Sequence, residues 1–216
     1  MKNAKIIAMM LAVVLVLSGF AMNAMAAENK AAAPVTPSVA QKGVPELKGD
    51  LVIWDRVDGK VDLLQDKDKV VKEIPADKLA LVAFGSRAEA GKEVKEALEN
   101  AYKQIVDAKA LTELSSDLEA VLKETGLKAD QLVVRDLIDI TLDPEYAKIL
   151  AEEPNYIALS FALGLEEGET LIVLHNVEGD QWETISGDSI AHGENGETVV
   201  AFDSLSPVAF VVAAKN

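Results

Sequence analysis

Tyr156-Ile-Ala-Leu-Ser-Phe-Ala-Leu163 is the stretch that decides the fold. Its large apolar side chains stand at every second position, namely Ile157, Leu159, Phe161 and Leu163, with smaller residues between them. Successive side chains of a β-strand point to opposite faces of the sheet. The alternation therefore predicts a strand with one face turned toward a hydrophobic core.

Further strand candidates surround this stretch and continue toward the C-terminus. They occupy residues 132–142, 170–177, 181–185, 198–202 and 208–212. Asn195-Gly196 is a strong hairpin signal before one of them, and Asp143-Pro144 predicts a short helix that ends by Pro154. Short strands with closely spaced turns are typical of antiparallel sandwiches. We therefore predict a β-sandwich-like domain over residues 128–216.

Three motifs in this half resemble the C-terminal module of secreted and cell-surface proteins of Gram-positive anaerobes. They are Leu171-Ile-Val-Leu-His175, Gly179-Asp-Gln-Trp182-Glu and Ser204-Leu-Ser-Pro-Val-Ala-Phe210, with Val199 to Phe202 between the last two. The resemblance covers roughly the last 60 to 85 residues, a size that suits a small sandwich. It implies an immunoglobulin-like β-sandwich that closes on a Ser-Pro-x-Ala-x-Val-type strand, and a location outside the cell rather than an activity. Phe20 replaces the acylated cysteine of lipid-anchored members and a wall-sorting signal is missing, so the resemblance does not extend to surface anchoring.

Residues 46–127 are predicted to form a smaller unit of strands followed by helices. Strand candidates lie at 51–54, 61–64 and 79–84, and Asp58-Gly59 suggests a turn between the first two. This order is compatible with either an α/β or an α+β unit. The predicted fold class of the whole chain is α+β, with this N-terminal α/β or α+β half followed by the C-terminal antiparallel sandwich-like half.

Two capping boxes mark the predicted helices of this unit. Ser86 with Glu89 opens the first helix, and Ser116 with Glu119 opens the second. Gly126 suits the left-handed residue that follows a helix end. The apolar stripe of the first helix consists of Val94, Ala97, Leu98, Ala101 and Ile105.

The first 26 residues have the order of a secretory signal peptide. Two lysines are followed by an uncharged stretch from residue 6 to residue 20, and then by the small residues Ala24 and Ala26. The apolar core is shorter than the about 20 residues that a membrane span requires. We expect cleavage between Ala26 and Ala27, and no stable membrane insertion of the mature chain.

Residues 27–45 are predicted to form a flexible spacer. They are rich in alanine and proline, including Pro34, Pro37 and Pro45, and they have no apolar periodicity. Such composition favours a spacer over a packed element.

Charge and cysteine content limit the partners and the chemistry. The chain has 21 basic and 36 acidic residues, a net charge of −15. Two of the lysines lie in the predicted signal, which leaves 19 basic residues and a net charge of −17. An acidic surface repels phosphate backbones, so no nucleic-acid partner is expected. The absence of cysteine excludes disulfides and thiolate chemistry, and it favours a bacterial source for an exported protein.

Few residues are candidates for catalysis. The two histidines, His175 and His192, are not accompanied by a nucleophile elbow, so a Ser-His-Asp hydrolase is not expected. Asp136 and Asp139 could supply carboxylates, but residues three apart in a strand point to opposite faces. Trp182 is expected to be a core anchor between the sheets, because a Trp side chain buries a large area.

Together these observations predict an exported, non-catalytic protein that is secreted or loosely associated with the cell surface. It would act as a binding or structural module for a protein or glycan at that surface, without a cofactor or metal. The alternative is an exported hydrolase or solute-binding protein with a carboxylate-lined site between the two halves, containing Asp136 or Asp139.

Overall fold

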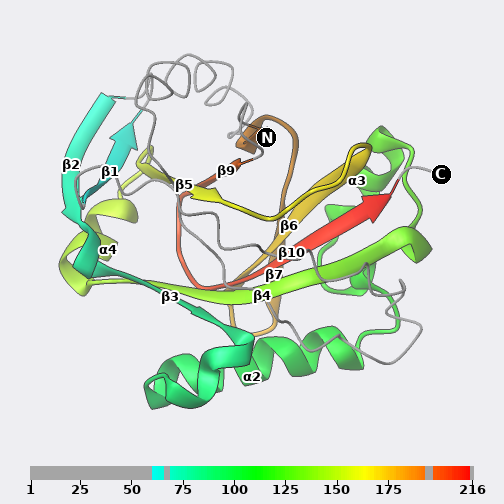
Figure 1. Cartoon of the computed structure of the whole chain (residues 1–216), viewed down its shortest axis with the longest axis horizontal. Helices are drawn as coiled ribbons and strands as arrows, with labels where there is room; N and C mark the ends of the chain where they lie inside the picture. The colour runs from blue at the N-terminus through cyan, green and yellow to red at the C-terminus, as the bar shows by residue number, and fades with distance from the viewer. Residues whose placement is uncertain (1–59, 66–68, 193–196, 215–216) are drawn as a thin grey trace.

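Two five-stranded antiparallel sheets, which we call sheet A and sheet B, lie face to face in the computed structural model (Figure 1). The structure describes residues 60–65, 69–192 and 197–214. The predicted signal, its cleavage residues Ala24, Ala26 and Ala27, the spacer 27–45 and the strand candidate 51–54 lie outside the described residues, as does the Asn195-Gly196 turn.

Sheet A has the strand order β2-β1-β5-β9-β8. Its strands are β1 (Lys60–Gln65), β2 (Lys69–Pro75), β5 (Tyr156–Phe161), β8 (Ile190–His192) and β9 (Thr198–Phe202). Ile157 in β5 lies opposite Leu63 of β1 and Phe202 of β9. Paired residues share a face of the sheet. The alternation predicted for β5 therefore determines which face of sheet A carries the large apolar side chains.

Sheet B has the strand order β3-β4-β10-β6-β7. Its strands are β3 (Leu79–Ala83), β4 (Leu132–Leu142), β6 (Glu169–Glu178), β7 (Gln181–Ile185) and β10 (Pro207–Ala214). Phe210 of β10 lies opposite Asp136 of β4 and Val173 of β6. The register of β4 shifts next to Phe210, which leaves Arg135 as an extra residue in a β-bulge.

The main core fills the space between the two sheets. Phe161, Phe202 and Phe210 are fully buried there, and the Phe161 and Phe210 ring centroids are 4.9 Å apart. The predicted inward set of β5 belongs to this core, with Ile157, Leu159 and Phe161 all fully buried. The sandwich-like arrangement predicted from the alternation is thus confirmed.

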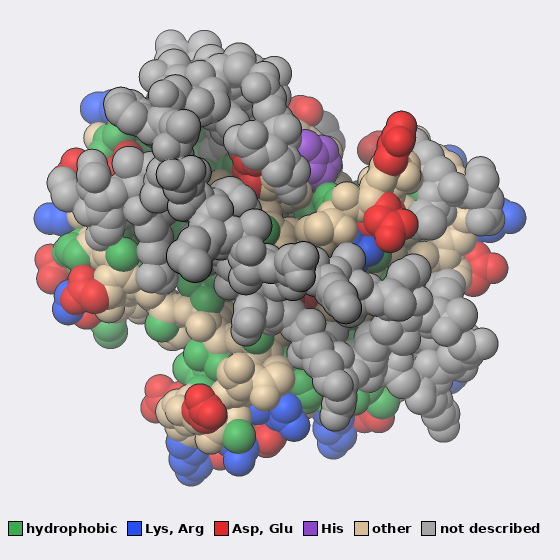
Figure 2. Space-filling model, in the orientation of Figure 1, with side chains coloured by type: hydrophobic (Ala, Val, Ile, Leu, Met, Phe, Trp, Pro, Cys, Tyr) green, Lys and Arg blue, Asp and Glu red, His purple; other side chains and the backbone are tan. Residues whose placement is uncertain are grey.

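A second core lies between the outer face of sheet B and the helices α2 (Lys92–Asp107) and α3 (Leu118–Thr125). Figure 1 shows α2 running beneath β3 and β4, on the side of sheet B that faces away from sheet A. Leu98, Ala101 and Ile105 of the predicted stripe are buried in this core. Basic and acidic side chains are interspersed on the opposite side of α2, along the lower edge of the molecule in Figure 2.

The predicted start of the first helix is wrong. Residues Phe84–Glu89 form a 3-10 turn instead, and α2 begins only at Lys92, after Gly91. Arg87 stabilises this turn, because its Nη1 donates to the Phe84 carbonyl at 2.8 Å and its guanidinium lies 3.8 Å from the centre of the Phe84 ring. The cation and the ring thus favour the tighter turn over a capping box at Ser86.

The second capping box is also wrong at its first residue. Asp117 precedes α3, and no side chain caps that end of the helix. The other end is as predicted, since Gly126 has a left-handed conformation with φ of 72°. Helix α4 (Pro144–Leu150) confirms the Asp143-Pro144 signal, because the Asp143 carboxylate accepts a hydrogen bond from the Glu145 amide.

Strand pairing joins the two segments on which the predicted domains were based. Strands β1 and β2, from the first segment, extend sheet A through pairing of β1 with β5, and β3 extends sheet B through pairing with β4. The described residues form a mixed α+β fold with a sandwich-like arrangement, and both segments contribute to both sheets. In this part of the chain, no helix has the length and apolar character needed to cross a membrane.

Candidate functional site

The two aspartates of the carboxylate hypothesis lie on opposite faces of sheet B. Asp136 pairs with Phe210, whose ring lies in the core between the sheets. Asp139 pairs with Val82, which packs against the core on the helix side. Sheet B therefore separates the two carboxylates, as expected for strand residues three apart, and they do not share one cleft.

Asp136 is a buried carboxyl group with a raised pKa. It is 6% exposed, and its Oδ1 accepts a hydrogen bond from the Leu137 amide at 2.8 Å. Burial disfavours the charged form and raises the pKa of Asp136 from 3.8 to about 7, against the smaller lowering effect of the Leu137 amide. This group can exchange a proton near neutral pH, although its surroundings are the interior of the sandwich.

We expect Asp136→Asn to make stability less dependent on pH. The folded state holds the Asp136 proton more tightly than the unfolded chain, so the stabilisation is complete below about pH 4 and is lost as the pH rises through about 7. Chemical denaturation at pH 4 to 8 should show wild type losing stability relative to the variant across this interval. Asp62→Asn, at an exposed position of β1, is the control. A difference between wild type and Asp136→Asn that does not change with pH would contradict this assignment.

Asp139 is buried on the other side of the same strand. Burial raises the pKa of Asp139, and the hydroxyl of Thr141, which donates to Oδ1 at 3.0 Å, opposes that shift. Thr141 is exposed, so the pair lies near the border of the helix layer.

His175 is fully buried on β6 and is held by a cross-strand carboxylate. Its Nδ1 lies 2.7 Å from Oε1 of Glu183, the residue opposite it on the edge strand β7. The ring of Phe202 from sheet A lies edge-on, 6.1 Å from the imidazole centre. Within the described ranges, Nε2 of His175 has no hydrogen-bond partner. This geometry indicates a structural role for His175, because Nδ1 is bound by Glu183 and the ring is fully buried.

His192 lies on the other sheet, in the edge strand β8. It is exposed, and its Nδ1 is 3.3 Å from the Thr198 hydroxyl on β9. The histidines and aspartates are thus distributed over two sheets. Among the residues with a described placement, no group of three or more His, Asp or Glu side chains could hold a metal ion.

Trp182 is buried as predicted, at 7% exposure, but it does not lie between the sheets. Its ring belongs to the core between sheet B and the helices. Its Nε1 donates to Oε1 of Gln104 on α2 at 2.5 Å, and Nε2 of Gln104 donates to the carbonyl of Gly179 and to the carboxylate of Asp180. The predicted location is wrong because helices that the sequence assigned to another unit cover this face of the sheet.

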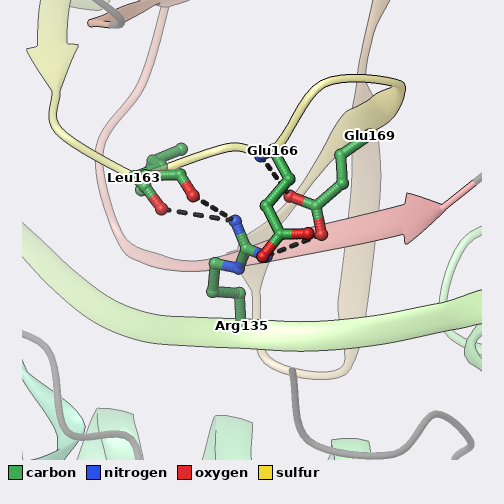
Figure 3. A network of polar contacts seen from close by, with 5 residues as sticks. Arg135, Leu163, Glu166 and Glu169 are labelled. Carbon is green, nitrogen blue, oxygen red and sulfur yellow. Dashed lines mark hydrogen bonds and ion pairs between the residues drawn. The ribbon is translucent and has the colours of Figure 1, made fainter. Parts of the chain in front are cut away.

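A partly buried ionic network, which was not predicted from the sequence, joins β4, β6 and the loop between β5 and β6 (Figure 3). Nη2 of Arg135, the bulge residue, donates to Oε1 of Glu169 at 2.7 Å, and Nη1 donates to the carbonyls of Leu163 and Gly164. The other carboxylate oxygen of Glu169 accepts the Glu166 amide at 2.9 Å. The donors of Arg135 are thus directed at the protein itself, and the network fixes the loop rather than presenting a cation to a ligand.

The comparisons with known proteins add no family to this picture. No family model, no curated protein and no solved structure matches the chain. The function is therefore inferred from the sequence and from the geometry of the described residues.

Proposed function

We propose that the chain is an exported, non-catalytic binding module that acts outside the cell membrane. The signal-like order of residues 1–26, with cleavage between Ala26 and Ala27, supports export. The acidic composition argues against nucleic acid as the partner. The proposed partner is a protein or a glycan at the cell surface.

One observation carries the non-catalytic part of the proposal: the polar side chains with the most chemical potential in the described sheets bind other parts of the protein and stabilise the fold. His175 is enclosed and bound by Glu183, Trp182 joins sheet B to α2 through Gln104, and Arg135 binds the loop after β5. Catalysis requires groups that can meet a substrate in a positioned cleft. Each of these side chains is instead bound to a neighbouring protein group: His175 to Glu183, Trp182 to Gln104 and Arg135 to Glu169.

Strand β2 is the surface that best suits a binding role. It is the edge of sheet A and pairs, among the described strands, with β1 alone. Val70 and Val71 are 47% and 38% exposed on it, and Lys69 and Lys72 flank them. An exposed edge strand offers backbone donors and acceptors to an extended segment of another protein. We therefore favour a protein over a glycan as the partner.

This function is tested by co-sedimentation of the purified mature protein with isolated native cell envelopes. The double variant Val70→Glu/Val71→Glu should bind several-fold more weakly, because it places charge on the edge that the partner would cover. Val177→Glu is the matched control, since Val177 is 44% exposed on β6, in the other sheet. Equal binding by all three proteins, or no binding by wild type, would contradict the proposal.

The alternative function, an exported hydrolase or solute-binding protein, is favoured by one observation. Asp136 has a pKa of about 7, which suits a general acid or base. The other candidate carboxylate, Asp139, faces the other side of sheet B, so Asp136 would have to act without it. Release of sugar or peptide products by the mature protein, abolished by Asp136→Asn, would support this alternative.

A further inference from the structure

Strand β2, the edge of sheet A, carries two lysines on one face. In the pairing with β1, Lys72 lies opposite Leu63 and Lys69 lies opposite Gln65. Leu63 and Gln65 are two positions apart in β1, so both lysines belong to the same face of the sheet. Leu63 is buried in the core between the sheets, so this is the face that sheet A turns toward sheet B. Both lysines are exposed at the rim of that face.

An exposed valine lies between the two lysines, on the opposite face of the strand. Val70 pairs with Leu64, and the register shift leaves Val71 as an extra residue before Lys72. The outermost strand of sheet A (Figure 1) therefore presents a cation, an apolar side chain and a second cation at successive pairing positions. A segment that pairs with the free edge of β2 would meet these three side chains in that order.

No carboxylate in the described part of the chain neutralises these two ammonium groups. The ion pairs found there involve neither Lys69 nor Lys72. Nζ of Lys72 lies 6.0 Å from the centre of the Tyr146 ring, an attraction that leaves its three hydrogen-bond donors available. Glu73 lies opposite Asp62, on the other face of the strand. The other described edge strands, β3, β7 and β8, contain no lysine or arginine, so β2 is a basic edge in a chain of net charge −15.

We propose that β2 binds an extended acidic segment of another protein, with two carboxylate side chains two positions apart and an apolar residue between them. The inference rests on the proposed binding function of β2. The two carboxylates would lie opposite Lys69 and Lys72, and the apolar residue would contact Val70. Opposite charges on neighbouring strands attract, whereas like charges directly opposite each other repel. The lysines therefore select the sequence of the segment, while the backbone of β2 supplies the hydrogen bonds.

The same lysines disfavour a second copy of the chain as the occupant. An antiparallel pair of β2 strands centred on Val70 would place Lys69 of each copy opposite Lys72 of the other. Lysines on an edge strand protect it against such self-association. The sequence of residues 1–59 contains no two acidic residues two positions apart, so it does not supply the segment either. A separate acidic protein is the occupant that remains.

The first test uses two short fluorescein-labelled peptides of equal composition and charge. One has Glu-Val-Glu at its centre and the other has Val-Glu-Glu, and only the first puts both carboxylates on one face of an extended strand. In fluorescence anisotropy, the purified mature protein should bind the first at least about threefold more tightly. In NMR spectra, that peptide should shift the amide signals of residues 69–75. Equal affinity for both peptides, or shifts confined to another part of the protein, would overturn the proposal.

A charge reversal provides the second test. The double variant Lys69→Glu/Lys72→Glu should lose its preference for the Glu-Val-Glu peptide and should instead bind a Lys-Val-Lys peptide at least about threefold more tightly than wild type does. Lys92→Glu/Lys95→Glu is the matched control, because it changes the net charge equally at two exposed positions of α2. A double variant of β2 that keeps the preference for Glu-Val-Glu, or a control that loses it, would overturn the proposal.

Co-sedimentation with native cell envelopes distinguishes this inference from the proposed function. Lys69→Glu/Lys72→Glu should sediment with envelopes several-fold less than wild type. Equal sedimentation of the two proteins would overturn the acidic-segment inference and leave the binding function in place. If wild type does not sediment but retains its preference for the Glu-Val-Glu peptide, the proposed function at the cell surface fails and the specificity of β2 stands.

Discussion

Trp182→Ala is expected to lower the free energy of unfolding by about 3–5 kcal/mol, the usual cost of removing a buried large aromatic side chain. The indole fills the layer between sheet B and α2, and its Nε1 donates to Gln104. The variant thus loses the transfer free energy of the ring, leaves a cavity and deprives Gln104 of a partner. Urea unfolding followed by circular dichroism measures the change.

Two milder variants separate these contributions. Trp182→Phe keeps most of the apolar area, and Gln104→Ala removes the hydrogen bonds to Trp182, Gly179 and Asp180 while the ring stays. Each should cost less than Trp182→Ala. An unfolding midpoint for Trp182→Ala within error of wild type, together with lost envelope binding, would show that Trp182 is a binding residue instead of a core anchor.

Removal of one partner from the Arg135–Glu169 pair should have the second large effect. Arg135→Met leaves the carboxylate of Glu169, whose side chain is 8% exposed, without its cation. Breaking a fully buried ion pair in this way typically costs about 3–5 kcal/mol, and the 23% exposure of the Arg135 side chain should bring the loss toward or below the lower end of this range. The loop carbonyls of Leu163 and Gly164 also lose their donor. Urea unfolding should show a comparable loss for Glu169→Leu, because it leaves the guanidinium uncompensated.

The double variant Arg135→Met/Glu169→Leu tests the cause. With both charges replaced by apolar groups, much of the lost stability should return, since no uncompensated charge remains. Lys92→Ala is the control: its pair with Glu96 is solvent-exposed at 3.7 Å, and such pairs contribute under about 1 kcal/mol. A double variant as unstable as the sum of the singles would contradict the charge-pair explanation.

The strands of the second half could be predicted because their signals are local. The predicted bounds of β4, β7 and β9 are those of the structure, since each combines a hydrophobic pattern with flanking turn residues. Strand β2 was missed because, in KVVKEIP, only Ile74 is buried, and its conformation depends on pairing with β1. The pairing of β1 with β5 joins residues more than ninety positions apart, which no local pattern encodes.

The environments of individual side chains were predictable only in part. The burial of Trp182 and the opposite orientation of Asp136 and Asp139 follow from residue type and strand periodicity. The layer that receives Trp182 depends on where α2 packs, and this is a tertiary property. The Arg135–Glu169 pair was missed because Arg135 lies in one predicted strand and Glu169 lies just before another, and opposite charges so placed indicate a pair only when the strands are known to lie in one sheet.

The most direct test of the central claim, export as a mature binding module, is the intact mass of the native protein in separated cell fractions. The account predicts a chain beginning at Ala27, recovered from the culture fluid or loosely held at the cell surface. A chain that retains Met1 and remains in the cytoplasmic fraction would contradict it.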